Sequence, residues 1–366
     1  MKKMKYQDYY SNVANKISPY QWEEGIPSNA LRFDTNTLPF PPSCLPEFFK
    51  KIKNDCPIND YNDPKYSKLK YLVADCEKVE PNMISITNSG DEAIDVLAKT
   101  FFNPGDNFLV TPPSYEMFTL QCLINNGNLI ESPLLDKTYD VNYKDIIEKS
   151  RSKKIKIIFL CNPNNPTGTV IKINTIEEII NKSGSIVVVD EVYREFYGKS
   201  SVQLLKKYNN LVILRSFSKF GAIAGVRVGY LISNPDLTLK FENIRLPLGV
   251  GYLSCKLAEY VLKYDKAGMR KQIEMIKLER KKLSEEFSKI GFTVLPSYAN
   301  FLLVKIGKNA EKICGKLKQK GIIIRDRSKK KYLEGCVRIT VKSNKENMFL
   351  IKAIKEVLNE EEKKII

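Results

Sequence analysis

The sequence contains no histidine, and this absence excludes several kinds of active site. Without an imidazole group, neither a Ser-His-Asp triad nor a Cys-His pair can form. Proton transfer near neutral pH must therefore use lysine, tyrosine, a carboxyl group, a thiol or a cofactor. The eight cysteines are scattered and form no C-x-x-C pair. We therefore expect no metal site, and we predict reduced thiols in a cytoplasmic protein.

Long apolar runs are also missing. No stretch approaches the roughly 20 residues that cross a bilayer, and Met1 to Asn15 lacks the apolar core of a secretory signal. We expect no membrane partner.

The charge is strongly positive, with 59 Lys and Arg against 42 Asp and Glu. A nucleic-acid-binding protein is one explanation. The basic residues are spread along the whole chain, however, with one dense cluster at Lys329-Lys330-Lys331. We therefore favour a lysine-rich surface and expect no nucleic-acid partner, while attraction of an anionic substrate is a further alternative.

The chain, at 366 residues, is too long for one simple core. Between residues 83 and 232, short apolar runs alternate with helical patterns, which predicts an α/β fold with a mostly parallel sheet covered on both faces. The predicted strands are Met83–Thr87, Asn107–Thr111, Lys156–Leu160, Ile186–Asp190, Leu211–Leu214 and Val228–Ile232, and the predicted helices are Asp91–Phe102, Tyr115–Ile124 and Asn174–Lys182.

The pattern changes after about residue 250. A long charged helical pattern from Leu253 to Lys289 precedes shorter elements, which indicates a second, smaller α/β domain. Its predicted strands are Thr293–Leu295, Phe301–Val304, Ile322–Arg325 and Val337–Val341, and its predicted helices are Ala310–Lys320 and Lys345–Leu358. The proline-rich first forty-odd residues suit an arm. We predict an arm at 1–42 that belongs to the small domain, a large domain at 43–245 and a small C-terminal domain at 246–366.

Two motifs follow predicted strands of the large domain. The segment from Asn162 to Gly168 reads N-P-N-N-P-T-G and alone indicates only a turn. The next strand ends in Asp190-Glu191-Val192-Tyr193. A carboxyl group at the end of an apolar strand needs a cationic partner, and a protonated pyridine nitrogen is such a partner. A helix N-cap is the alternative for Asp190.

Two further motifs follow in order. Ser216-Phe217-Ser218-Lys219 ends a predicted strand, where partial burial lowers the pKa of a lysine and frees its amine for covalent chemistry. Arg227 lies eight residues beyond Lys219. Together, Ser216, Ser218 and Arg227 offer two hydroxyls and a guanidinium, which are suitable phosphate ligands.

The order N-N-P-T-G, D-E-x-Y, S-x-S-K and G-x-R-x-G-Y resembles the fold-type I pyridoxal-phosphate aminotransferases, over about residues 16 to 355. The resemblance implies a mostly parallel seven-stranded sheet in the large domain and pyridoxal 5′-phosphate as the cofactor. It implies that Lys219 carries the cofactor and moves the proton, and that Asp190 keeps the ring nitrogen protonated. Asn165 and Tyr193 would bind the ring oxygen.

The same resemblance assigns further residues. The backbone amides of Gly90 and Asp91 would open a helix and bind the phosphate. Tyr115 resembles the aromatic residue that stacks on the pyridine ring. Tyr61 resembles a tyrosine that reaches the cofactor phosphate of the neighbouring subunit, which implies a homodimer with shared active sites.

Within that superfamily, the sequence resembles the histidinol-phosphate aminotransferases most closely. Ser18-Pro19-Tyr20-Gln21 and the late arginines Arg325 and Arg338 carry this likeness. It implies that Tyr20, Asn165, Arg325 and Arg338 bind the substrate, and arginine suits both phosphate and carboxylate. A surface ion pair is the alternative for each arginine. The implied reaction is transamination between histidinol phosphate and 2-oxoglutarate, in histidine biosynthesis.

Two segments depart from the subfamily. The stretch 34–39, Asp-Thr-Asn-Thr-Leu-Pro, lacks a glutamate, and the stretch 247–252 lacks an asparagine. Both lie where substrate side chains are selected. A threonine-phosphate decarboxylase-like reaction and an aromatic or broad-specificity aminotransferase therefore stay open. A regulatory or nucleic-acid-binding module on the same fold is an alternative of another class, although such proteins usually carry an extra DNA-binding domain.

Overall fold

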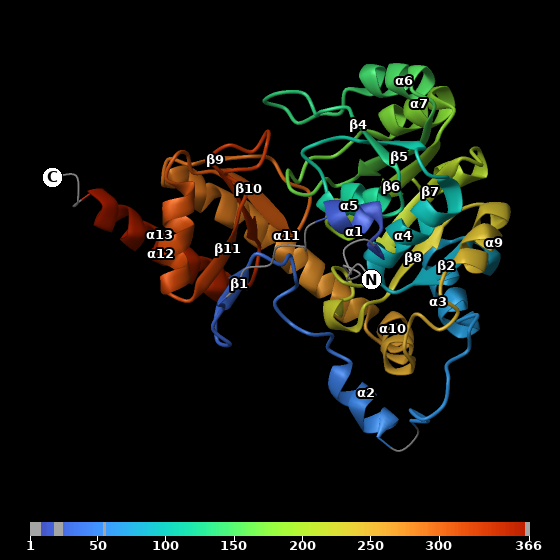
Figure 1. The fold of residues 1–366 in the computed structure, drawn as a ribbon. Helices are drawn as coiled ribbons and strands as arrows, with labels where there is room; N and C mark the ends of the chain where they lie inside the picture. The colour runs from blue at the N-terminus through green and yellow to red at the C-terminus, as the bar shows by residue number, and fades with distance from the viewer. Residues whose placement is uncertain (1–8, 18–24, 54–55, 363–366) are drawn as a thin grey trace, which may run out of the picture.

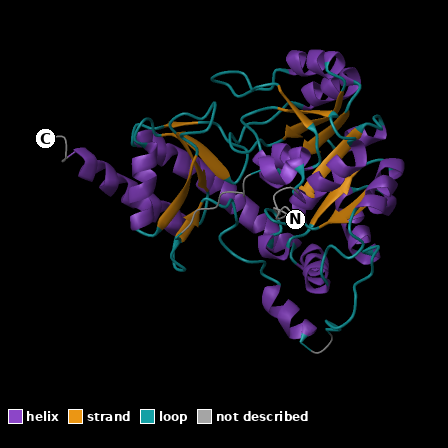
Figure 2. Ribbon diagram, in the orientation of Figure 1, coloured by secondary structure: helices purple, strands orange, loops and turns teal. Residues whose placement is uncertain are grey.

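The computed structural model describes residues 9–17, 25–53 and 56–362, and it contains two β-sheets (Figure 1). The larger sheet has seven strands in the order β2-β8-β7-β6-β5-β3-β4, and the smaller has five in the order β1-β11-β12-β10-β9. Figure 2 shows the two sheets in separate lobes, each with its own helices. The fold class predicted from the sequence is confirmed.

The seven-stranded sheet is mostly parallel. Only β8 runs antiparallel to its neighbours β7 and β2, whereas the other pairings are parallel. Every predicted strand of this sheet is present, and the unpredicted β4 lies at its edge. The strands are β2 (Ile84–Thr87), β3 (Asn107–Val110), β4 (Asn128–Glu131), β5 (Ile155–Cys161), β6 (Ile186–Asp190), β7 (Leu211–Ser216) and β8 (Gly229–Ile232).

Helices cover both faces of this sheet, as the apolar strands require. Along β6, Val187 and Val189 join one core and Val188 joins the other, because alternate side chains point to opposite faces. Burying each valine contributes about 1.5–3 kcal/mol. The first face is covered by α3 (Ser67–Glu77), α6 (Tyr143–Ser152), α7 (Ile173–Ser183) and α10 (Tyr252–Tyr264), and the second by α4 (Ser89–Phe101), α5 (Glu116–Ile124) and α9 (Pro235–Ile244).

The smaller sheet packs only one face against helices. Ile322, Ile324, Val337 and Ile339 lie in a core shared with the last helices. Arg325 and Arg338 alternate with these residues and therefore project from the other face. The elements are β9 (Thr293–Val294), β10 (Phe301–Lys305), β11 (Ile322–Asp326), β12 (Cys336–Thr340), α11 (Lys266–Lys289), α12 (Ala310–Gln319) and α13 (Asn344–Glu362).

The N-terminal segment joins both lobes. Strand β1 (Leu31–Phe33) adds to the smaller sheet, parallel to β11. The short helix α1 (Asn12–Lys16) precedes it and α2 (Leu45–Ile52) follows it. Phe48, on α2, packs in the core of the larger lobe. Short helical turns occur at α8 (Arg194–Tyr197), Pro81–Met83, Val202–Lys206 and Ala224–Val226.

The long helical pattern predicted from Leu253 to Lys289 is two helices. Asp265 separates α10 from α11, and its carboxylate accepts hydrogen bonds from the backbone and side chain of Ser43. Helix α10 packs in the core of the larger lobe. In α11, Met269 lies in that same core, and Ile276 lies in the core of the smaller lobe. The division at residue 245 stays a prediction, and this packing leads us to propose a boundary inside α11.

Candidate active site

The sequence motifs meet at one edge of the larger sheet. The strands β5, β6 and β7 are parallel, so their carboxyl ends lie together. The loop that contains Asn165 follows β5, Asp190 is the last residue of β6, and Lys219 follows β7 by three residues. This is the edge where open α/β sheets bind ligands.

Asp190 is a buried carboxyl group, only 4% exposed. Its Oδ1 accepts a hydrogen bond of 3.0 Å from the backbone amide of Val192. Within the described ranges, no lysine or arginine makes an ion pair with it. Burial raises its pKa from the ordinary 3.8 to about 7, and the negative charges of Asp91 and Glu191 contribute in the same direction. The site therefore favours a cation beside this carboxylate.

Lys219 is partly buried, and its Nζ donates a hydrogen bond of 3.0 Å to the backbone oxygen of Thr35. Burial, together with the positive charges of Arg338 and Arg227, lowers the pKa of this amine from 10.5 to about 7. The amine lies 6.0 Å from the centre of the Tyr193 ring. A substantial fraction of Lys219 is thus uncharged near neutral pH.

A polar cluster forms at the N-terminus of α4. Arg227 Nη2 donates to Ser89 Oγ at 2.6 Å and to Asp91 Oδ2 at 2.7 Å. Tyr115 Oη donates to the other oxygen of Asp91 at 2.8 Å. The amides of Gly90 and Asp91 lie in the first turn of α4, where backbone N–H groups and the helix dipole favour an anion.

Ser216 and Ser218 lie beside this cluster. Their hydroxyls are 2.9 Å apart, and Ser216 is paired with Gly229 across the ladder. A Cβ at Gly229 would lie 2.6 Å from the carbonyl carbon of Ser89 and 2.9 Å from the nitrogen of Gly90. Sequence reasoning gave Gly229 no role, although it belongs to the motif G-x-R-x-G-Y. Only glycine permits this close approach of β8 to α4.

The arm reaches three of the predicted residues. The backbone oxygen of Asp34 accepts a hydrogen bond from Arg338, and that of Thr35 accepts from Lys219. Asn36 Nδ2 donates to Tyr193 Oη at 3.0 Å. The sequence did not predict these contacts, because two of them use backbone oxygens, which leave no residue signature, and the third joins side chains 157 residues apart. The missing glutamate in the stretch 34–39 was the one available signal.

Arg338 links the two lobes through Asn165. Its Nη1 donates to Asn165 Oδ1 at 2.8 Å, and its side chain is buried. Arg325 stands directly opposite Arg338 on the neighbouring antiparallel strand. Like charges in that position are unfavourable by themselves. The pair is therefore suited to an anion bound between the lobes.

One predicted residue of the described ranges is not brought into this cluster. Tyr61 is 88% exposed on the loop before α3 and hydrogen-bonds to none of the described residues. A single chain does not test its predicted contact with a neighbouring subunit. Tyr20 lies outside the described residues.

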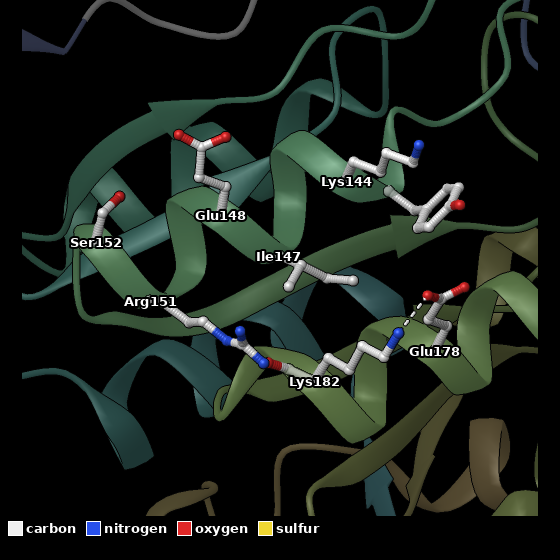
Figure 3. Close-up of a pocket in the computed structure, with 8 residues that line it drawn as sticks. Lys144, Ile147, Glu148, Arg151, Ser152, Glu178 and Lys182 are labelled. Carbon is white, nitrogen blue, oxygen red and sulfur yellow. Dashed lines mark hydrogen bonds and ion pairs between the residues drawn. The ribbon is translucent and has the colours of Figure 1, made fainter.

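A separate hollow of about 770 Å³ lies between α6 and α7 (Figure 3). None of the predicted site residues lines it. Among its charged groups, Lys182 Nζ lies 2.6 Å from Glu178, and Arg151 Nε donates to the backbone oxygen of Lys182. The chemistry therefore belongs to the sheet edge and not to this hollow.

The described ranges contain neither a membrane-spanning helix nor a cluster of metal ligands. No helix there is long and apolar enough to cross a membrane. No group of three or more Cys, Asp or Glu side chains there is arranged to bind a metal ion.

Comparison with known proteins identifies the family of this chain. The family described as aminotransferase class I and II matches residues 26–354. A histidinol-phosphate aminotransferase of Caldanaerobacter subterraneus subsp. tengcongensis is 38% identical over 341 residues, which cover 92% of this chain and 95% of the relative. A second, from a Thermoanaerobacter species, is 39% identical over 333 residues, which cover 89% and 93%.

A solved structure shares the fold. The histidinol-phosphate aminotransferase of Sinorhizobium meliloti, in complex with pyridoxal-5′-phosphate, superposes with a TM-score of 0.87 at 22% identity, covering 96% of this chain and 98% of that one. The resemblance predicted from the ordered motifs is confirmed. The chain belongs to the class I and II aminotransferases.

Proposed function

We propose that this protein is a pyridoxal-phosphate-dependent aminotransferase that exchanges the amino group between histidinol phosphate and 2-oxoglutarate, yielding imidazole-acetol phosphate and L-glutamate. The names of relatives at 38–39% identity support this substrate. We further propose a cytoplasmic homodimer. All eight cysteines are free, as expected in a reducing compartment.

The observation that carries the proposal is the buried carboxyl group of Asp190. A buried carboxylate without a cationic partner is costly, and a protein keeps one where a ligand supplies the cation. The protonated ring nitrogen of pyridoxal phosphate is such a cation. The residues present therefore fit the cofactor: Asp190 is suited to its ring nitrogen, and the α4 cluster is suited to its phosphate.

The remaining contacts follow from the clustering of the motifs. The phosphate-binding set comprises the amides of Gly90 and Asp91, the hydroxyls of Ser216 and Ser218, and Arg227. Asn165 and Tyr193 would bind the ring oxygen, and Tyr115 would cover the ring. When bound, the cofactor supplies a carbonyl carbon for the amino group and an electron-withdrawing ring that stabilises negative charge at the substrate Cα.

Lys219 has two roles in this proposal. Its uncharged fraction at neutral pH supplies the amine that holds the cofactor. With cofactor and substrate bound, Lys219 Nζ would be the base that takes the proton from the substrate Cα. The hydrogen bond to Thr35 keeps Nζ in the site.

The substrate class follows from the cationic face of the smaller sheet. Arg325 and Arg338 present two guanidinium groups, which bind phosphate and carboxylate with equal geometric ease. The reaction needs such a site because histidinol phosphate and glutamate occupy it in turn. Tyr20 would assist them.

Product analysis tests the reaction. Purified protein loaded with pyridoxal phosphate is incubated with histidinol phosphate and 2-oxoglutarate, and L-glutamate and carbon dioxide are measured. We expect stoichiometric glutamate without carbon dioxide, and no product from Lys219→Ala. In a parallel incubation with threonine phosphate, which carries the carboxyl group that histidinol phosphate lacks, carbon dioxide release would indicate a decarboxylase. Glutamate from phenylalanine but not from histidinol phosphate would indicate an aromatic aminotransferase.

The dimer is proposed from Tyr61 and its surroundings. Tyr61 and Ile58, on the same loop, are 88% and 68% exposed. The loop is joined to residues 245–250 by a 2.6 Å hydrogen bond from Arg245 to Pro64, and Leu246 there is 68% exposed. A partner subunit would bury these apolar groups.

Mixing two inactive variants tests shared sites. If Tyr61 reaches across the dimer interface, each active site takes Lys219 from one subunit and Tyr61 from the other. Lys219→Ala and Tyr61→Ala then remove groups that different subunits contribute to one site. Mixed dimers then contain one intact site, and activity returns to about a quarter of the wild-type value on statistical mixing. Failure to restore activity in confirmed mixed dimers would place Tyr61 in its own subunit's site or outside both.

A further inference from the structure

The hydroxyl of Tyr193 receives a hydrogen bond from the arm. Asn36 Nδ2 donates to Tyr193 Oη at 3.0 Å, and the two side chains are distant in sequence but buried together. The Tyr193 ring packs edge-on against Phe301, with centroids 5.1 Å apart. With the ring held in this way, the direction of the hydroxyl proton is the main freedom left to Tyr193.

The orientation of the Asn36 amide is determined by Thr340. The backbone N–H of Asn36 donates to Thr340 Oγ1 at 2.9 Å, so the Thr340 proton must go elsewhere. That proton points to Asn36 Oδ1, at 3.2 Å. The amide oxygen therefore faces Thr340, and the amide nitrogen faces Tyr193.

The backbone of Asn36 is fixed as well. Its φ of 53° lies in the left-handed region, which asparagine tolerates better than most residues. Its carbonyl oxygen accepts a 2.9 Å hydrogen bond from Asn300 Nδ2. All four hydrogen-bonding groups of Asn36 thus have partners, and the donor that faces Tyr193 has no freedom to turn away.

A hydroxyl that accepts from a fixed donor directs its own proton elsewhere. We propose that Asn36 is a positioning residue, which occupies an acceptor site of Tyr193 so that the tyrosine proton points to the ring oxygen of the cofactor. This inference rests on the proposed function. Burial raises the pKa of Tyr193, so the proton needed for donation stays on the hydroxyl.

The consequence for the cofactor has a definite sign. A proton donated to the ring oxygen stabilises its negative charge, and so favours the deprotonated form of the bound cofactor. Loss of that donation raises the pKa of the visible absorbance transition. Asn36→Gly keeps the left-handed backbone and removes the amide. Asn36→Asp replaces the donor by an acceptor, toward which Tyr193 would turn its proton.

The test is a pH titration of the visible absorbance of the bound cofactor. We expect Tyr193→Phe to raise the proton affinity of the bound cofactor about tenfold, which is one pKa unit. We expect Asn36→Gly to raise the same affinity about threefold. On the Tyr193→Phe background, Asn36→Gly should add nothing, because it acts through the missing hydroxyl. Asn126→Gly, which makes the same change at an exposed left-handed asparagine after α5, should titrate like the wild type.

Asn36→Asp and Thr340→Val extend this test. Asn36→Asp should approach the shift of Tyr193→Phe, and Thr340→Val, which releases the amide, should shift the transition in the same direction. Melting of each cofactor-free variant checks its fold, and Thr340→Val replaces Asn36→Gly if the latter does not fold. The inference would be overturned if Asn36→Gly, or its substitute Thr340→Val, titrated like the wild type while Tyr193→Phe was shifted. It would also be overturned if Asn36→Gly shifted the transition equally on the wild-type and the Tyr193→Phe backgrounds. A wild-type protein with no visible band would instead overturn the proposed function.

Discussion

Arg325 on β11 and Arg338 on β12 are directly paired across an antiparallel ladder, so two guanidinium groups share one face of the smaller sheet. Such a pair is unfavourable without an anion or other acceptors nearby. Arg338 contacts the amide oxygen of Asn165 and the backbone oxygen of Asp34, both of which are neutral. Both guanidinium groups therefore lie on the face that we propose binds the anionic substrate.

Arg325→Gln should weaken the enzyme selectively toward phosphorylated substrate. Loss of one charge-assisted contact costs about 1.5–3 kcal/mol, or roughly 10- to 150-fold in kcat/KM. We expect this fall with histidinol phosphate and a much smaller one with histidinol. Arg151→Gln, on α6, is the matched control and should change neither. An equal fall with both substrates would contradict a phosphate contact.

Asp190→Asn should stabilise the cofactor-free protein while impairing cofactor binding. The folded-state pKa of Asp190 is raised from 3.8 to about 7, so the folded protein binds more protons than the unfolded one between these values. The ionised carboxylate of Asp190 therefore destabilises the folded protein increasingly as pH rises toward 7, and the full destabilisation applies above pH 7. Asparagine does not titrate, so its advantage should grow from pH 5 to pH 8, up to about 4 kcal/mol.

Urea unfolding at the two pH values measures this difference. Cofactor titration of the same variant should show at least about tenfold weaker retention, since the cationic ring nitrogen loses its carboxylate. A variant that is less stable than the wild type at pH 8 would contradict an uncompensated carboxylate at this position.

Gly229→Ala should weaken binding of the cofactor phosphate. The new methyl would meet the backbone of Ser89 and Gly90 at 2.6–2.9 Å and push the start of α4 away from β8. We expect at least about tenfold weaker cofactor binding, measured by fluorescence titration. Gly225→Ala is the control, because its Cβ has open space within 4 Å. Equal affinity in both variants would show that the close approach is unimportant.

Arg215→Met should destabilise the whole protein. Arg215 is 1% exposed and pairs with three acids, Glu77, Glu191 and Glu195, at 2.8–3.3 Å. Removing it leaves buried carboxylates uncompensated, at a cost of about 3–5 kcal/mol in the free energy of unfolding. Lys207→Met removes an exposed pair with Glu177 and should change little. A denaturation midpoint unchanged by Arg215→Met would contradict the network.

The sequence was sufficient for the regular part of the fold. Apolar strands buried on both faces produce continuous runs such as Ile186–Asp190, and these were predicted to within a few residues. Edge strand β4 was missed because it is short and partly exposed, without alternation. The break at Asp265 was missed because it depends on contacts with Ser43, which is 222 residues away in sequence.

The residues of the active site also divide into those that the sequence predicts and those that only tertiary packing reveals. Residues with a distinctive side chain in a motif, such as Lys219 and Asp190, were found from the sequence. Backbone acceptors and close approaches depend on tertiary packing, so the roles of Thr35 and Gly229 emerged only from the structure. Tyr61 depends on a partner subunit and stays a prediction.

The central claim is that this site exchanges an amino group with two different anionic substrates. The most direct measurement follows the visible spectrum of the cofactor-loaded protein after separate additions of L-glutamate and L-histidinol phosphate. Loss of the visible band with each, with 2-oxoglutarate formed from the first, is the predicted result. A band that persists after both additions would contradict the account.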